Sequence, residues 1–286
     1  MSYFSIVIPS FNRAHIINRA IQGILEQTFQ DFEILIVDDG STDNTKGIIE
    51  EYSTDARINY HFQNNAGVSA ARNTGAKLAT AAFLIFLDSD DTVEKSWLRD
   101  FHDSLVNQNY DIAYCNITVL KPAGTPKKIN AANPYGNNTG KGANIPGSWA
   151  IKTALFFKIG MYDTLIKFGE NSELRLRLEF EKPKVVLVDK YNFNYYASTD
   201  GGSKNNQNKV DSILYTLNKH KAHYDKNTRV KKLYLQNAAV AAVRIGQVKK
   251  AHELFAMALI DHKKDTKLWL QYFLTSSKFL AKLIWR

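Results

Sequence analysis

The 286-residue sequence contains a single cysteine and no long apolar run. Cys115 alone cannot form an internal disulfide, and no Cys/His cluster has the spacing of a zinc site. The longest mostly apolar stretch, Ala79 to Leu87, falls short of the about 20 residues that span a bilayer. These absences exclude a disulfide scaffold and a zinc finger, and they favour a reducing compartment.

We expect the first residues to form a strand and not a secretion signal. The stretch MSYFSIVIPSFNR has no basic leader before its apolar run and is interrupted at Pro9, which is typical of a first strand. A hydrophobic content of 44% is enough for a real core. We therefore expect a globular protein that stays in the cytoplasm.

Most of the chain also lacks an excess of positive charge, although the formal net charge is +9. Residues 1–209 hold 22 Lys and Arg against 23 Asp and Glu, whereas residues 210–286 hold 15 against 5. The positive charge is therefore not spread over the chain as in a nucleic-acid-binding domain. We expect no nucleic-acid partner and a separate basic region at the C-terminal end.

Residues 1–120 alternate strand-like and helix-like segments. Apolar runs at 4–8, 32–39, 58–62 and 82–88 are separated by amphipathic segments such as 14–28, where Ile17, Ile21, Ile24 and Leu25 share a helical face. The helix after the second run is expected to be capped by Ser41 or Thr42. The pattern predicts an α/β fold with a mostly parallel sheet between helices.

A polar stretch at 198–209 separates this region from a tail that reads as three or four helices. We place the domains at 1–205 and 206–286, the second all-α and basic. Residues 233–262 read as a helical hairpin of the tetratricopeptide type that turns at Gly246, with no second copy after it.

Carboxylates gather where two of the predicted strands end. Asp38, Asp39 and Asp43 follow the second run, and Asp88, Asp90 and Asp91 follow the fourth. Ligands of open α/β sheets bind at this edge, and clustered carboxylates there favour Mg²⁺ or Mn²⁺ held together with substrate phosphates. For Asp38, Asp43 and Asp91 we favour roles in turns or caps, and for the other three ligand binding.

Four segments together resemble the glycosyltransferases of family 2, of the bacterial surface-polysaccharide type. They are SIVIPSFNR, QTFQDFEILIVDDGSTDNT, NNAGVSAARNTGAKLA and FLIFLDSDD, and they occur in order within about the first 100 residues. The resemblance implies the GT-A nucleotide-sugar-binding fold with an all-α C-terminal extension. It also implies an inverting hexosyltransferase that uses a divalent metal, Mn or Mg.

The resemblance assigns a role to each matching residue. Pro9 and Phe11 would flank the nucleobase of a UDP-sugar donor, with Asp39 hydrogen-bonding the base. Asp88 and Asp90 would form the Asp-x-Asp pair near the ribose and diphosphate, with Asp90 the metal ligand. Arg72 would lie near the donor, although an ion pair with the acids would explain it equally well.

The expected catalytic base departs from the family pattern. Members place it in a Glu-Asp pair shortly after a G-x-F-D segment, but here GMYD is followed by GENSE, so that Asn171 stands where the Asp is expected. An amide cannot accept the acceptor's proton. Glu170 or Glu173 could serve instead, the helix could be offset by one residue, or the enzyme could be weak or inactive; we favour Glu170.

Two aromatic segments leave alternatives open. Trp149 suits a platform for an acceptor sugar as well as it suits the core. In the tail, one helical stripe carries Lys267, Gln271, Thr275, Lys278 and Lys282 and the opposite side carries Trp269, Phe273, Leu280 and Ile284. This pattern fits peripheral binding to the anionic inner face of the membrane, near a glycan or lipid-linked acceptor, as well as docking on the catalytic domain.

Two rival functions remain. A non-catalytic nucleotide-sugar or glycan binder of the same fold would explain Asn171. The segment FLDSDDT also fits the Asp-x-Asp-x-Thr motif of haloacid-dehalogenase-type phosphatases, but that motif normally closes the first strand of its fold and here it follows the fourth.

Overall fold

The computed structural model describes residues 2–106, 108–131, 145–197, 205–277 and 280–281. Contacts within the chain divide it into two compact units. Unit 1 comprises Met1–Thr164 and Asn171–Thr199, and unit 2 comprises Leu165–Glu170 and Asp200–Arg286. We propose a domain boundary between residues 205 and 206.

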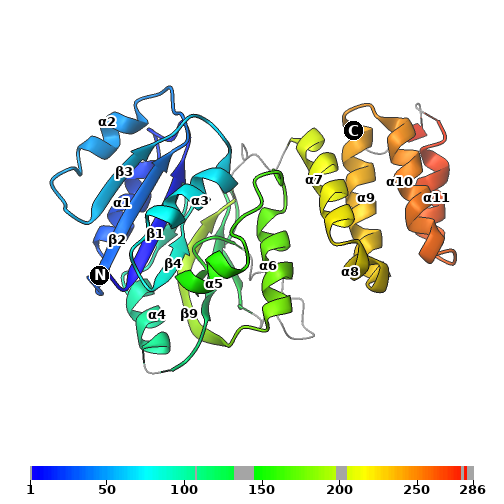
Figure 1. The fold of residues 1–286 in the computed structure, drawn as a ribbon. Helices are drawn as coiled ribbons and strands as arrows, with labels where there is room; N and C mark the ends of the chain where they lie inside the picture. Colours follow the sequence, from blue (N-terminus) through cyan, green and yellow to red (C-terminus); the bar gives the residue numbers. More distant parts are fainter. Residues whose placement is uncertain (1, 107, 132–144, 198–204, 278–279, 282–286) are drawn as a thin grey trace. The chain divides into compact units, whose positions relative to one another are not determined.

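Unit 1 is built on a sheet whose described part has nine strands (Figure 1). The strand order is β3-β2-β1-β4-β8-β6-β9-β5, with β7 paired to β6. The first four strands are mutually parallel, and β8 is antiparallel to both of its neighbours. The bounds are β1 (Phe4–Ser10), β2 (Phe32–Asp38), β3 (Ile58–Phe62), β4 (Phe83–Phe86), β5 (Thr92–Val93), β6 (Ile112–Leu120), β7 (Lys127–Ile129), β8 (Trp149–Lys152) and β9 (Val185–Tyr196). The four predicted strands are confirmed.

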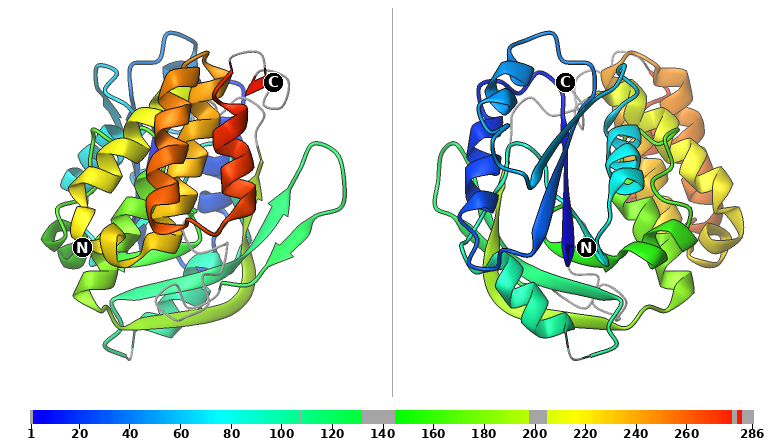
Figure 2. Two further views of the ribbon diagram at one scale, coloured as in Figure 1. Left: turned by 90° about the vertical axis from the view of Figure 1, so that its right-hand side faces the viewer. Right: turned by 60° about the vertical axis from the view of Figure 1, so that its left-hand side comes forward.

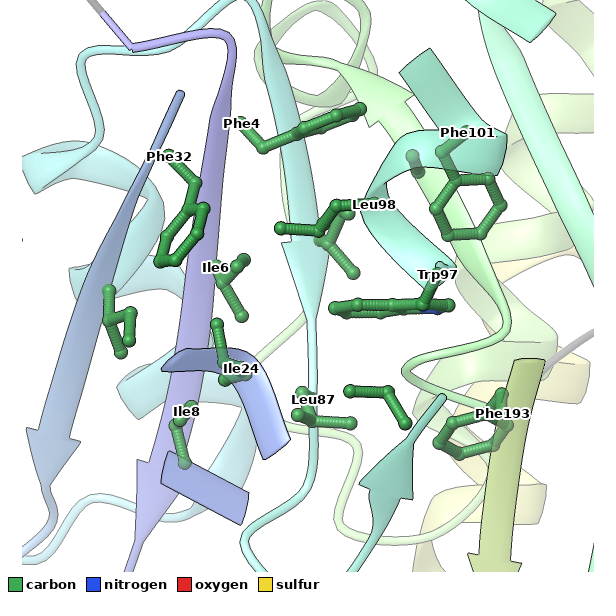
Figure 3. Close-up of a cluster of buried hydrophobic side chains, with 14 of the residues drawn as sticks. Phe4, Ile6, Ile8, Ile24, Phe32, Leu87, Trp97, Leu98, Phe101 and Phe193 are labelled. Atoms are coloured by element: carbon green, nitrogen blue, oxygen red, sulfur yellow. The ribbon is translucent and has the colours of Figure 1, made fainter. Parts of the chain in front are cut away.

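Alternate residues of the central strands enter two different cores. From β1, Phe4, Ile6 and Ile8 pack on one face of the sheet, whereas Val7 packs on the other. Figure 3 shows the first of these cores, where Trp97 and Leu98 from a covering helix meet the strand residues. Both faces of these strands are therefore buried, which explains their unbroken apolar sequence.

Helices cover the two faces. Those that contribute to the core with Phe4 are α1 (Ile17–Leu25), α2 (Thr45–Glu50) and α4 (Trp97–Leu105). Those that contribute to the core with Val7 are α3 (Val68–Leu78), α5 (Thr153–Lys158) and α6 (Glu170–Glu181). Trp149 lies in β8 and is buried in this second core, so of its two expected roles the structure gives it the one in the core.

Pro9 lies inside β1, where a proline normally costs a ladder hydrogen bond. Residues of β1 alternate between its neighbours: Val7 O accepts from Leu87 N on the β4 side, and Ser10 O accepts from Asp39 N on the β2 side. The backbone N of Pro9 therefore points to the β4 side. The pairing of β1 with β4 has already ended there, at Val7 and Phe86. The missing N–H costs no pairing there, and the strand continues to Ser10.

Unit 2 consists, in its described part, of five helices (Figure 2), and all of them but the shortest contribute side chains to an alanine-rich core. They are α7 (Asn206–Lys219), α8 (Lys221–Lys226), α9 (Thr228–Arg244), α10 (Val248–Asp261) and α11 (Thr266–Leu274). The hairpin turn at Gly246 is confirmed, since its φ of 81° is the left-handed conformation that favours glycine. No described helix is long and apolar enough to cross a membrane.

Helix α11 differs from the amphipathic pattern expected of it. Thr275 is buried, with its hydroxyl 3.2 Å from His252 Nδ1, and Gln271 accepts from Gln236 Nε2 at 2.7 Å. Trp269 and Phe273 are exposed. Gln271 and Thr275 therefore do not lie on the solvated stripe expected of them, whereas the exposure of Trp269 and Phe273 leaves the membrane-surface alternative open. Lys278, Lys282 and Ile284 lie outside the described residues.

Candidate active site

The loops that follow β1 and β2 are hydrogen-bonded to each other. The N–H of Asn12 donates to Ser41 Oγ at 2.8 Å, and Asn12 Oδ1 accepts from the N–H groups of Thr42 at 2.8 Å and Asp43 at 3.4 Å. Asn12 has a φ of 54°, a left-handed conformation that Asn tolerates better than most residues. These contacts fix the loop, and Phe11 stands 45% exposed beside it.

Further contacts complete the junction of the two loops. The N–H of Arg13 donates to Thr45 Oγ1 at 2.9 Å, and that of Ala14 donates to Asp43 Oδ2 at 3.0 Å. Asp43 Oδ1 also accepts from Thr45 N, which confirms the expected turn role of Asp43. Asn44, and not Ser41 or Thr42, precedes α2, and it makes no side-chain cap.

The two aspartates that follow β2 brace different loops. Asp38 accepts from Ser41 N at 2.8 Å, which confirms its turn role, and from the Tyr60 hydroxyl at 2.9 Å. Burial, followed by the hydrogen bond to Asp38, raises the pKa of Tyr60.

Asp39 is only 4% exposed. It accepts from Gln63 Nε2 at 2.7 Å, from Ala66 N at 2.9 Å and from Gly67 N at 2.8 Å. A carboxylate offers about four acceptor positions, so one is left for a ligand such as a nucleobase.

Two arginines from different helices bond to residues of the acid cluster that follows β4. Arg72 of α3, whose side chain is 3% exposed, donates from Nη2 to Asp88 Oδ1 at 2.7 Å, while the Asp88 side chain is 29% exposed. Arg19 of α1 donates to the backbone carbonyl of Asp90. Burial and then the charge of Asp88 raise the pKa of Asp90, partly offset by Arg13 and Arg19. The site is therefore a mixed cluster of acids and arginines.

Asp91 has the expected turn role through its backbone, since its N–H donates to Asp88 O at 3.1 Å, but its side chain makes a contact that a turn does not require. It is fully buried, and its Oδ1 accepts from Tyr196 N, at the end of β9, at 2.8 Å. The guanidinium of Arg19 lies 3.8 Å from the centre of the Tyr196 ring. Burial raises the pKa of Asp91 well above its usual range, followed by the charge of Asp88. The side chain of Asp91 thus links the acid cluster to the end of β9.

The residues present fit a divalent cation only in part. No group of three or more His, Cys, Asp or Glu side chains in the described ranges could hold a metal by itself. Asp88 and Asp90 are both partly exposed. Because Mg²⁺ and Mn²⁺ are often held by one or two carboxylates with waters and substrate phosphates, this pair suits a cation that arrives with a diphosphate.

The candidate bases lie at the start of α6. Asn171 Oδ1 accepts from the Tyr162 hydroxyl at 2.9 Å. Glu173 is buried, and both its oxygens accept from Arg177, at 2.7–3.0 Å. Glu173 is therefore engaged in an ion pair and is a poor proton acceptor. Glu170 opens α6 but belongs by its contacts to unit 2, and its role as a base stays a prediction.

Four residues of this region were not predicted: Asn12, Arg13, Arg19 and Tyr162. Asn12 gave a usable signal, because an Asn after a strand end suits a left-handed turn. The other three gave none, since Arg13 before α1, Arg19 on α1 and Tyr162 before α6 acquire their partners only through the tertiary fold.

The family model described as "Glycosyl transferase family 2" matches residues 5–158, more than half of the chain. The chain belongs to glycosyltransferase family 2. The matched part contains Pro9, Phe11, Asp39, Arg72, Asp88 and Asp90, and it ends before α6.

Curated relatives of this family 2 chain act on different acceptors. An Escherichia coli protein, UDP-Glc:alpha-D-GlcNAc-diphosphoundecaprenol beta-1,3-glucosyltransferase WfgD, is 37% identical over 117 residues, 41% of this chain and 46% of the relative. Poly(ribitol-phosphate) beta-N-acetylglucosaminyltransferase TarP of Staphylococcus aureus is 34% identical over 116 residues, 39% of this chain and 36% of the relative. The chain thus spans less than half the length of these two relatives.

Solved structures extend the likeness to nearly the whole chain. S. aureus TarS 1-349 in complex with UDP-GlcNAc has a TM-score of 0.65 at 18% identity, covering 97% of this chain and 91% of that one. The same protein without that ligand has a TM-score of 0.62 at 16% identity and covers 99% and 93%. The predicted GT-A fold with a helical C-terminal part is confirmed.

Proposed function

We propose that this protein is an inverting glycosyltransferase that moves a hexosyl group from a UDP-sugar to a hydroxyl of a glycan or lipid-linked acceptor. The observation that carries the proposal is the cluster at the end of β4, where Asp88 meets Arg72 at 2.7 Å and Asp90 lies beside them, in a chain of family 2. The relatives WfgD and TarP, whose names specify such transfers, support it.

The donor would occupy the carboxyl edge of β1, β2 and β4. Phe11 would lie against the uracil, beside Pro9, and the remaining acceptor position of Asp39 would take a base N–H. Asp88 would meet the ribose and diphosphate, and Asp90 would hold Mn²⁺ or Mg²⁺. When bound, the metal neutralises charge that develops on the departing diphosphate.

The acceptor hydroxyl must lose a proton as it attacks C1 from the face opposite the leaving group. We assign this step to Glu170, because Glu173 is held by Arg177 and Asn171 is an amide. The alternative is a protein of the same fold that binds a nucleotide sugar or glycan without turnover. We do not propose the phosphatase, because its motif closes β4, the fourth strand along the chain, and the chain belongs to family 2.

Thermal-shift measurements with nucleotide sugars, with and without Mn²⁺, test the donor site. A matching donor should raise the melting temperature through mass action, and Asp90→Asn should lose the part that depends on Mn²⁺. Asp103→Asn, an exposed aspartate on α4, is the matched control and should respond like the wild type. A donor panel that never shifts the wild type would overturn the donor site.

Turnover separates the enzyme from the binder. Release of UDP in the presence of the stabilising donor and a glycan acceptor should be detectable in the wild type and should fall strongly in Glu170→Gln. Donor binding without any turnover across a broad acceptor panel would favour the non-catalytic alternative. Full activity in Glu170→Gln would refute the assignment of the base alone.

We further propose that the protein works in the cytoplasm and binds peripherally to anionic lipid, where acceptors for cell-envelope polysaccharide are made. Support comes from α11 and the turn before it, where Lys263, Lys264 and Lys267 are exposed close in sequence to Trp269 and Phe273, the latter 63% exposed. Lysines near exposed aromatic side chains suit an anionic interface.

Sedimentation with phosphatidylcholine vesicles, with and without phosphatidylglycerol, tests this. We expect binding only to the anionic vesicles, weakened by salt and by Trp269→Ser together with Phe273→Ser. Leu187→Ser, at an exposed apolar side chain of β9, is the control. Equal binding to neutral vesicles, or none to either, would contradict the proposal.

A further inference from the structure

Two successive residues of α3, Arg72 and Asn73, reach different partners. Arg72 pairs with Asp88 at 2.7 Å. Asn73 holds the backbone of Tyr162 on both sides: its Nδ2 donates to Tyr162 O at 2.8 Å, and its Oδ1 accepts from Tyr162 N at 2.9 Å. One turn of α3 therefore holds both the Asp88 carboxylate and the backbone of Tyr162.

The backbone before Tyr162 adopts an unusual conformation. Gly160 has a φ of 85° and Met161 a φ of 60°, and the latter is rare for a bulky residue. The N–H of Met161 donates to Phe156 O at 3.1 Å, and Asn73 clamps the next residue. Such a conformation persists only where its surroundings over-determine it, so the place of Tyr162 is closely specified.

The side chain of Tyr162 joins the same two regions. Its buried ring packs against Phe86, two residues before Asp88, with 5.3 Å between ring centres. The guanidinium of Arg72 lies 5.2 Å from the centre of the ring, within the range of a cation–π interaction. Its hydroxyl donates to Asn171 Oδ1 at 2.9 Å. Tyr162 thus contacts the donor-side arginine, the donor-side strand and α6.

We propose that Tyr162 is a positioning residue that couples occupancy of the Asp88 site to the start of α6. This inference rests on the proposed function. A donor and its cation compete with Arg72 for Asp88, and any shift of the guanidinium changes its interaction with the Tyr162 ring. Because the hydroxyl of the same ring holds Asn171, the first turn of α6 responds to the donor.

Hydrogen exchange on the full-length protein tests the coupling without requiring turnover. In the wild type, the donor that raises the melting temperature should slow exchange in a peptide covering residues 171–181. In Tyr162→Phe, which keeps the ring and deletes the hydroxyl, that donor should still bind but the protection should be lost. Tyr52→Phe is the matched control, because it also deletes a hydroxyl that donates to an asparagine Oδ1, that of Asn18.

The results separate the coupling from the proposed function. Equal donor-induced protection in Tyr162→Phe and the wild type would overturn the coupling and leave the glycosyltransferase standing. The same holds for a wild type that binds donor without protecting α6. If no donor binds the wild type, the proposed function fails and the coupling fails with it.

Kinetics of an active enzyme add a second readout. Tyr162→Phe should lower kcat by about 3- to 10-fold, the range of one hydrogen bond, with little change in the donor KM. Asn171→Ala should lower kcat similarly, and the double variant should be no slower than Asn171→Ala alone. If the kcat losses of the two single variants multiplied in the double variant, a role exerted through Asn171 would be refuted. A change in the donor KM alone would refute it as well.

Discussion

Replacement of Gly75 by Ala tests how closely α3 must approach the sheet. A Cβ built at Gly75 would lie 2.3 Å from Val7 Cγ1 and 3.2 Å from Val37 Cγ2. Overpacking of this kind costs about 1–3 kcal/mol, whereas Gly to Ala inside a helix gains about 0.5–1 kcal/mol. We therefore expect Gly75→Ala to lower the free energy of unfolding by about 1 kcal/mol.

The assay is urea unfolding of the full-length chain followed by circular dichroism, with Gly23→Ala on α1 as the control. A Cβ at Gly23 meets nothing closer than Val93 Cγ2 at 3.7 Å, so this variant should be as stable as the wild type or more so. Because Arg72 lies on the same helix as Gly75, Gly75→Ala should also weaken donor binding. If Gly75→Ala proved as stable as Gly23→Ala, the close-packing argument would be refuted.

A compensating change sharpens the test. Val7→Ala removes both Cγ atoms that crowd position 75 and should by itself cost about 2 kcal/mol through the cavity it leaves. The double variant should lose less than the two single losses combined, because the new methyl group fills part of that cavity. The rescue should be partial, since Val37 Cγ2 remains at 3.2 Å.

Three further predictions concern stability and reactivity. The hydrogen bond and charge of Arg57 lower the pKa of Asp55 to about 2, so the stability that this carboxylate contributes is present above about pH 4 and is lost as the pH falls through 2. Urea unfolding should show Asp55→Asn less stable than the wild type by about 1 kcal/mol at pH 7, and this difference should vanish only below about pH 2. Asn12→Ala should be about 1 kcal/mol less stable than Asn12→Gly, because only glycine adopts the left-handed φ freely; the reverse order would refute that reading. Burial raises the pKa of Cys115, so a thiol reagent should label it only after unfolding.

The first half of the fold was predictable because its signals are local. The runs that became β1, β2 and β4 are apolar on both faces, and the apolar residues of the helices between the strands recur with the helical period. Clustering of Asp88 and Asp90 at a sheet edge follows from parallel strands that end together. The turn roles of Asp38 and Asp43 also follow, since both bond to residues two or three positions away.

What could not be predicted depends on partners distant in sequence. Asp91 has the same local surroundings as a turn residue, yet it bonds to Tyr196, 105 residues away. Thr275 and Gln271 read as a solvated stripe because the periodicity of α11 does not reveal which side meets α9 and α10. Tyr162 is one aromatic residue among many until the fold places Arg72 and Asn171 against it.

The path of the chain between the two units limits how the protein can be dissected. It leaves unit 1 after Thr164, contributes Leu165–Glu170 to unit 2 and returns at Asn171. In that segment Lys167 N donates to Ser212 Oγ at 3.0 Å, and Phe168 packs on the helical core. A single cut therefore cannot yield two intact pieces, because the residues immediately before Asn171 would lose the helices that hold them. A truncated chain that ends near residue 199 would for this reason be a poor sample for kinetics, whatever its solubility.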